Sequence, residues 1–207
     1  MPNWCSNELT VTGDKEAISR YVAGIQMDND TESPMLIESY LPTPLELTTT
    51  MSGGFSDKSS QEALDLAAMQ QSNIDKYGHK DWYDWNIANW GTKWSDSDTD
   101  GGDIYSDGTA VSYTFQSPWG PPEEAFRRIS AMFPELTFVL SFCEDGMGFY
   151  GATSFFNGEV AAEAGGDISS IEGYDEIDFD SEDTDCYEKA HELQQDAREE
   201  ATRLVQI

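Results

Sequence analysis

The opening of the chain alternates apolar and polar positions and then changes to a helical spacing. Asn7 to Thr12 alternates around Leu9 and Val11, which predicts a short strand. Asp14 is placed to cap the helix that follows, because apolar residues recur after it at intervals of three and four, at Ile18, Tyr21, Val22 and Ile25. The chain is therefore expected to begin with a strand and a helix.

The same order returns after residue 110. Residues 111–115 alternate as in a half-buried strand, and Pro122 opens a helix whose apolar spacing lasts until Phe133. Period-two runs then predict strands at 136–142, 147–156 and 159–161, with turns at 144–146 and at Asn157-Gly158. Together the two halves predict an antiparallel sheet with helices on one face, a ferredoxin-like α+β fold that occupies residues 1–162.

A segment of about residues 45–108 is expected to be inserted between these halves. Met35 to Tyr40, just before it, is expected to be a strand. Ser59 and Glu62 have the spacing of a capping box, which predicts a helix that runs toward Gly78. Residues 95–108 are rich in Asp, Ser and Gly, and we expect a loop there.

Residues 77–94 hold four of the six tryptophans. On a helix, Trp82, Trp85 and Trp90 would fall within an arc of roughly 140°, with Asp81 and Asp84 on the far side. Since each large ring can bury about 150–250 Å², we interpret four residues as an aromatic clamp of the core: Trp82, Trp85, Trp90 and Trp94. The alternative is an exposed aromatic platform that grips a partner.

Charge is the strongest feature of the composition. The chain has 40 Asp and Glu residues against 11 Lys and Arg, a formal net charge of -29. This balance excludes direct binding to nucleic acid and favours a cationic protein partner, because phosphate binding depends on Lys and Arg. Aromatic residues make up 12% of the chain and hydrophobic residues 38%, so we expect it to fold despite its charge.

The densest acidic run lies in residues 163–188, which contain no Lys or Arg. Closely spaced carboxylates on a folded support can imitate the phosphates of duplex DNA. The expected partner-binding residues are Glu163, Asp167, Glu172, Asp175, Glu176, Asp178, Asp180, Glu182, Asp183, Asp185 and Glu188. A helix with a weak apolar face is predicted after Tyr187, so residues 163–207 form an acidic extension that ends in a helix.

A second acidic segment has the spacing of a calcium-binding loop. Asp96, Asp98 and Asp100 precede Gly101, and Asp107 stands at the twelfth position. Asp107 replaces the usual bidentate Glu, however, and two clean flanking helices are absent from the pattern. We therefore expect no cofactor, with calcium at these four Asp residues as the alternative.

The residues that could carry catalysis are sparse. His79 and His191 are far apart in sequence, and Cys143 lies within a predicted strand, so no nucleophilic triad or metal pair is indicated. Cys5, Cys143 and Cys186 are interpreted as reduced thiols of a cytoplasmic protein. Neither a signal peptide nor a membrane span is recognisable, and we expect a protein that is not an enzyme.

Three parts of the chain also resemble a known family. They are MPNWCSNELTVTG at 1–13, WYDWNIANWGTKW at 82–94, and FQSPWGPP at 115–122 followed by FPELTF at 133–138. Together they resemble the YubB-like proteins, a phage- and plasmid-borne family with a ferredoxin-like domain, over residues 1–160. The resemblance implies that fold and a mobile-element origin, and it brings no catalytic residues, because the function of the family is unknown.

The chain departs from the family pattern at 96–107 and beyond residue 162, where a specialised role is expected. The sequence therefore favours a phage or mobile-element accessory protein. We expect it to bind and inhibit a basic, nucleic-acid-handling host defence protein, with DNA mimicry as the expected means. The alternatives are a calcium-stabilised structural or assembly module, and an adaptor that uses its tryptophans to trigger host defence. The oligomeric state stays open.

Overall fold

The computed structural model describes residues 2–174, 176–177 and 185–206. Its elements in chain order are β1 (Trp4–Thr12), α1 (Lys15–Gly24), β2 (Gln26–Met27), β3 (Pro34–Met35), α2 (Leu45–Thr48), α3 (Gln61–Tyr77), α4 (Trp82–Trp90), β4 (Ser97–Ile104), β5 (Ala110–Pro118), α5 (Glu123–Met132), β6 (Thr137–Glu144), β7 (Phe149–Phe156), β8 (Glu159–Asp167), the 3₁₀ turn η1 (Ile168–Ser170) and α6 (Asp185–Val205).

Six of the strands form one antiparallel sheet in the order β4-β5-β1-β6-β7-β8. The strand predicted around Leu9 and Val11 is its centre, with Leu9 paired to Tyr113 on one side and Leu140 on the other. Asn157 and Gly158 both have positive φ, 50° and 83°, as a two-residue hairpin turn requires between β7 and β8. The α+β class predicted from the sequence is confirmed.

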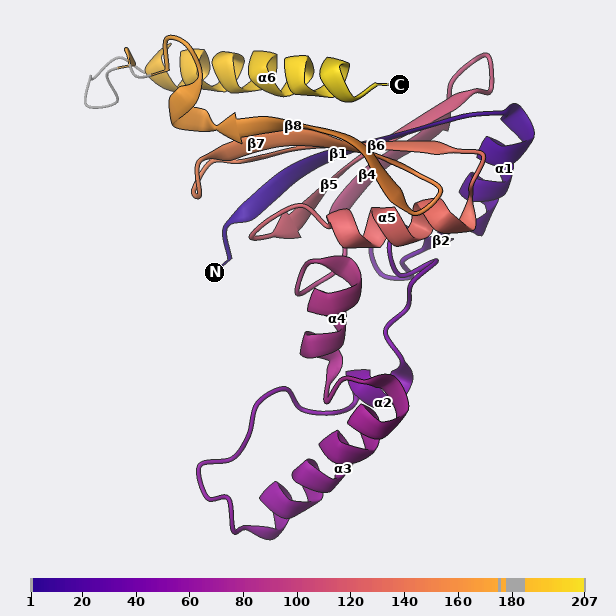
Figure 1. Cartoon of the computed structure of the whole chain (residues 1–207), viewed down its shortest axis with the longest axis vertical. Coiled ribbons are helices and arrows are strands. Elements are labelled where there is room, and N and C mark those ends of the chain that lie inside the picture. Colours follow the sequence, from indigo (N-terminus) through magenta and orange to yellow (C-terminus); the bar gives the residue numbers. More distant parts are fainter. Residues whose placement is uncertain (1, 175, 178–184, 207) are drawn as a thin grey trace.

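The main core lies between one face of the sheet and the helices α1 and α5 (Figure 1). Alternate residues of β1, β5 and β6 point into it, as the period-two pattern predicts. Tyr21 of α1 packs edge-on against Phe138 and Phe133, with ring centroids 5.4 Å apart in both pairs. Burial of these aromatic rings is the largest stabilising contribution to this layer.

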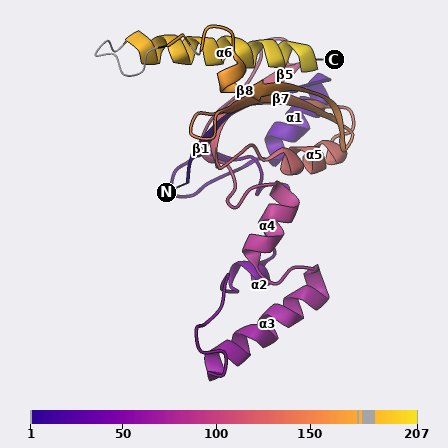
Figure 2. The same cartoon turned by 60° about the vertical axis from the view of Figure 1, so that its left-hand side comes forward.

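Helix α6 packs on the opposite face of the sheet, over β6, β7 and β8 (Figures 1 and 2). Its Ala201 and Val205 are buried against Val139 and Ala152, which form a second, smaller core. Arg198 of α6 also makes an ion pair with Glu8 of β1 at 3.5 Å. The weak apolar face seen in the sequence is therefore buried within the chain, and the sheet carries helices on both faces.

The segment between β3 and β4 forms an arm that extends away from the sheet (Figure 2). Its outer helix, α3, is capped by Ser60, whose side chain accepts a hydrogen bond from the Ala63 amide at 3.2 Å. This cap lies one residue later than the predicted cap at Ser59. Helix α4 joins the arm to the sheet and ends at Gly91, which has a φ of 84°.

Three sequence predictions are wrong here. Residues 36–40 form turns instead of a strand, because Leu36 and Ile37 direct their amides to the Asp96 carboxylate. Asp81, predicted on the helix face opposite the tryptophans, instead lies just before α4 and caps it; its buried carboxylate accepts a hydrogen bond from the Asp84 amide at 3.1 Å. Residues 97–104, predicted as part of a loop, form the edge strand β4.

Close approach to β5 explains why β4 contains glycines. A Cβ at Gly101 would lie 2.5 Å from the Ser112 carbonyl oxygen, and one at Gly102 would lie 2.8 Å from the Tyr113 ring. The strand also has irregular register at two points, so its side chains do not alternate as a strand signal requires. The predicted insertion at 45–108 therefore includes one strand of the sheet.

Candidate functional site

The expected acidic partner-binding residues divide into two groups. Glu163 and Asp167 are exposed on the edge strand β8, and Glu172 and Glu176 are exposed after it. Asp175, Asp178, Asp180, Glu182 and Asp183 lie outside the described residues, as do the side chains of Asp185 and Glu188. The boundary expected at residue 162 falls within β8, so the acidic extension begins inside the sheet.

Glu163 and Asp167 line a shallow basin of about 550 Å³ on the face that carries α5. We call it the acidic basin and define it by Glu123, Phe142, Phe149, Thr153, Glu163 and Asp167. Gly165, which also lines it, allows β8 to lie close to β7, because a Cβ there would lie 2.4 Å from the Tyr150 carbonyl oxygen. The Phe142 and Phe149 rings meet edge-on, with centroids 6.1 Å apart.

Glu123 is the member of the basin that the sequence analysis did not identify. It is the first residue of α5, where the positive end of the helix dipole stabilises a carboxylate. The buried Thr153 hydroxyl donates a hydrogen bond to it at 2.5 Å, which holds the carboxylate toward β7. Three carboxylates from α5 and β8 thus surround aromatic rings, an arrangement that suits a positively charged, partly apolar partner.

Six of the eleven Lys and Arg residues form ion pairs with carboxylates of the chain within the described residues. Arg127 and Arg128 are the only Lys or Arg residues between Lys93 and Lys189, and both make ion pairs with Glu124, at 2.8 and 2.6 Å. The other ion pairs in the described part of the chain are Arg20–Glu135, Lys76–Glu46, Lys80–Asp84 and Arg198–Glu8. Most of the acidic side chains in the described part of the chain therefore have no ion-pair partner, and those of Asp98, Asp100, Glu163 and Asp167 are exposed to solvent.

The four Asp residues with calcium-loop spacing have separate roles. Asp96 accepts hydrogen bonds from the Leu36 amide at 2.9 Å, the Ile37 amide at 3.0 Å and the Thr99 hydroxyl at 2.8 Å. Burial raises the pKa of the Asp96 carboxyl in spite of these bonds. Asp107 instead accepts the Thr109 amide in a turn.

Asp98 and Asp100 are exposed on β4. Within the residues that the structure describes, no group of three or more His, Cys, Asp or Glu side chains is placed to hold a metal ion.

The four tryptophans expected to form a clamp occupy different environments. Trp90 is buried, and Trp85 packs against it edge-on with ring centroids 5.9 Å apart. Trp82 is half-buried and Trp94 is 39% exposed. Trp82 and Trp94 line a surface hollow together with Trp90, so the stretch contributes both to the core and to the surface.

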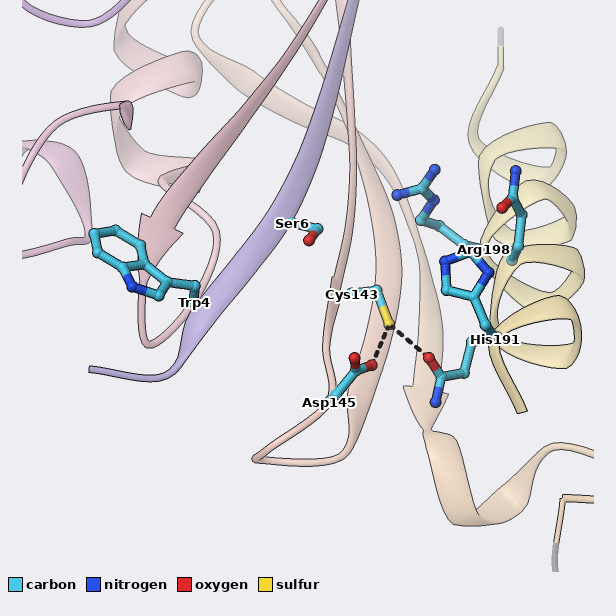
Figure 3. Close-up of a pocket in the computed structure, with 8 residues that line it drawn as sticks. Trp4, Ser6, Cys143, Asp145, His191 and Arg198 are labelled. Carbon is cyan, nitrogen blue, oxygen red and sulfur yellow. Dashed lines mark hydrogen bonds between the residues drawn. The ribbon is translucent and has the colours of Figure 1, made fainter. Parts of the chain in front are cut away.

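A small pocket between β6 and α6 brings together residues that are distant in sequence (Figure 3). Cys143, Asp145, His191 and Arg198 line it, with a volume of about 100 Å³. The Cys143 thiol donates to Asp145 at 3.6 Å and to Gln194 at 3.9 Å. Burial and the neighbouring Asp145 carboxylate raise the pKa of the Cys143 thiol to about 12, so the reactive thiolate is scarce at neutral pH and the pocket does not suit nucleophilic catalysis.

The raised pKa of the Cys143 thiol can be tested by alkylation. A shift from 9.0 to about 12 leaves on the order of a thousandfold less thiolate at pH 8 than in an ordinary cysteine, so Cys143 is expected to resist iodoacetamide in the folded chain. The Asp145→Asn variant should react faster, because it removes a carboxylate that raises the thiol pKa. Mass spectrometry of the alkylated peptide measures both rates, with the urea-unfolded chain as the reference. Rapid alkylation of the folded wild-type chain would contradict this reading.

Glu144, the other acidic residue of this hairpin, has a structural role. Its carboxylate is buried and accepts hydrogen bonds from the amides of Gly146 (3.0 Å) and Met147, which closes the turn between β6 and β7.

No helix in the described part of the chain is long and apolar enough to cross a membrane.

One family model matches part of the chain, and one solved structure aligns with it at low similarity. A search of curated proteins found no match. The crystal structure of a protein api92 from Yersinia pseudotuberculosis aligns with 79% of this chain and 98% of that chain, at 12% sequence identity and a TM-score of 0.44. Residues 89–172, which contain β4 to β8 and α5, match a family model described as the ferredoxin-like domain in Api92-like protein.

This match confirms the ferredoxin-like fold predicted from the sequence. The matching model describes Api92-like proteins, so the resemblance to YubB-like proteins and the mobile-element origin stay expectations. Residues 89–172 are therefore similar to the ferredoxin-like domain of Api92-like proteins, a family defined by its fold and not by a known activity.

Proposed function

We propose that this protein is a non-catalytic accessory protein of a phage or other mobile element that binds and inhibits a basic, nucleic-acid-handling host defence protein. The observation that carries the proposal is the distribution of charge. Six of the eleven Lys and Arg side chains form ion pairs with carboxylates of the same chain, whereas no ion pair within the described residues involves a carboxylate of β4, β8 or the acidic basin. A basic cleft on a partner would be attracted electrostatically to this surface, as it is attracted to the phosphates of DNA.

The acidic basin is the described part of this surface with the most features of a docking site. It combines carboxylates from two elements with exposed aromatic area, so it offers both charge and apolar contact to an incoming basic side chain. The exposed Glu172 and Glu176 extend the negative charge beyond β8. Such a surface is expected to accelerate association and to fix the orientation of a basic partner.

The decisive experiment compares two variants with the same change in charge. One variant replaces the basin carboxylates, Glu123→Gln, Glu163→Gln and Asp167→Asn; the matched control replaces three carboxylates of the arm helix α3, Glu62→Gln, Asp65→Asn and Asp75→Asn. A partner is captured from bacterial lysate on the wild-type chain and identified. Its affinity for each purified chain is then measured by titration calorimetry at about 50 mM and about 500 mM salt.

The basin variant is expected to bind about tenfold or more weakly at low salt, because each lost charge contact costs on the order of 0.5–1 kcal/mol. The α3 control should stay near wild-type affinity. The wild-type chain should also displace a labelled DNA duplex from the partner. An affinity that is unchanged between the two salt concentrations would refute electrostatic capture, and a partner that keeps its duplex in the complex would favour the adaptor function over inhibition.

A further inference from the structure

Two adjoining hollows lie where the 28–43 segment meets the end of α4 and the start of β4. The first has a volume of about 390 Å³ and is lined by Trp82, Trp90 and Trp94, among others. The second has a volume of about 360 Å³, and its charged lining residues are Asp28, Glu38, Asp96 and Asp98. Glu38 and Ser95 line both hollows, so the two form one groove with an aromatic half and an acidic half, which we call the Trp–acid groove.

The aromatic half is held in shape by hydrogen bonds to the backbone. The buried Trp90 indole donates to the Leu41 carbonyl at 2.9 Å. The buried Asn86 amide donates to the Lys93 carbonyl at 3.0 Å, and its oxygen accepts the Thr43 hydroxyl at 2.7 Å. Because these bonds fix the floor before any ligand arrives, binding would require little ordering of the protein.

The chemistry of the groove favours a cation. No Lys or Arg side chain lines either hollow in the described part of the chain. Aromatic ring faces attract ammonium and guanidinium groups, and tryptophan does so best. The Trp94 ring already attracts a cation of the chain, because the Lys93 ammonium lies 4.0 Å from its centroid, and an incoming cation would compete with Lys93 for this ring.

The acidic half carries fixed negative charge beside these rings. Asp28 accepts the amides of Asp30 and Thr31 at 2.9 and 2.8 Å, and these bonds lower the pKa of its carboxyl, so it is ionised at neutral pH. Asp98 and Glu38 are exposed, and Glu38 accepts the Ser95 hydroxyl at 3.1 Å at the junction of the two hollows.

We propose that the Trp–acid groove binds an extended basic segment of a protein partner. One arginine or lysine side chain lies in the aromatic half beside Trp82 and Trp94, and a second positive side chain meets Asp28 and Asp98. Residues on the same side of an extended chain are about 6.5–7 Å apart, which suits two neighbouring hollows that share a wall. This inference rests on the proposed function only in taking the partner to be basic. It assigns a second site, at which the shape of the groove helps to recognise individual side chains.

The test uses fluorescein-labelled nona-arginine and nona-lysine peptides and measures fluorescence anisotropy at about 150 mM salt. Trp94→Leu is compared with Trp119→Leu, since Trp119 is 50% exposed but does not line the groove. Glu38→Gln is compared with Glu62→Gln, which lies on the arm helix α3. Circular dichroism confirms that all four variants are folded.

Trp94→Leu is expected to weaken nona-arginine binding about five- to tenfold, as loss of a partly desolvated cation–π contact would, and Glu38→Gln is expected to weaken it about two- to fivefold. The two control variants should bind within about twofold of wild type. Equal losses in test and control variants, or no loss in either, would overturn the proposal. Because the peptides replace the host partner, this result is independent of whether the chain displaces DNA from a defence protein.

Discussion

Replacing Trp90 with alanine is expected to lower the free energy of unfolding by about 3–5 kcal/mol, the range for removal of a large buried aromatic side chain. Trp90 is 2% exposed and belongs to the main core. Its removal would also leave the Leu41 carbonyl without the indole donor and would deprive Trp85 of its edge-on neighbour. Urea unfolding followed by circular dichroism measures the change, since the fluorescence of the variant is altered by the substitution itself.

Two further variants serve as comparisons for Trp90→Ala. Trp119→Ala removes an exposed indole and should change the unfolding free energy by less than about 1 kcal/mol. Trp90→Phe keeps an aromatic ring but loses the hydrogen bond to Leu41, so an intermediate loss is expected. If Trp90→Ala proved no more harmful than Trp119→Ala, the junction between α4 and the sheet would not be part of the cooperative core.

Replacing Asp96 with alanine is expected to cost about 2–4 kcal/mol, because it leaves the amides of Leu36 and Ile37 without their acceptor. Both of these residues are fully buried, so water cannot replace the carboxylate at low cost. Asp100→Ala, at an exposed position four residues further along the chain in β4, is the control and should change stability by about 0.5 kcal/mol or less. Thermal and urea unfolding of the two variants provide the comparison, and equal losses would rule out the bridging role of Asp96.

The Asp96 carboxyl also makes the stability of the folded chain depend on pH, in a direction that its pKa predicts. Its pKa is raised by burial, so the folded chain holds this proton more tightly than the unfolded chain does. The resulting contribution favours folding below the unfolded pKa of about 3.9 and is lost as pH rises through the higher folded pKa. The stability of the wild-type chain relative to Asp96→Asn should therefore improve as pH falls from 7 toward 4; a difference that does not change with pH would contradict a raised pKa.

Most of the elements that sequence patterns predicted correctly have one face against the core; α3, in the arm, was predicted from its cap instead. β1 and β6 bury alternate side chains, and α1 and α5 bury residues at helical spacing. Burial therefore gives the apolar residues of each element a period from which its type can be predicted. β4 was missed because it is an edge strand held by backbone pairing, with glycines where β5 approaches closely. Residues 36–40 were misassigned because a short apolar run has no period that separates a strand from a buried turn.

The candidate sites were predictable only in part, for the same reason. Charge density identified Glu163 and Asp167 directly, because charge is a property of composition. Glu123, Phe142 and Phe149 join them only through the packing of α5 on β7, which no local pattern reports. Similarly, the tryptophan-rich stretch was recognisable, but the exposure of Trp94 depends on contacts with segments far away in sequence.

The acidic side chains of the two outer strands have a consequence for self-association. An unpaired strand at the border of a sheet can recruit the same strand of another copy, and charged side chains are a common barrier to such growth. β4 carries Asp98, Asp100 and Asp103, and β8 carries Glu159 and Glu163. Protonation of these groups in acid would remove the repulsion, so the sheet could extend from one molecule to the next. The same protonation would also remove the negative charge that attracts a basic partner.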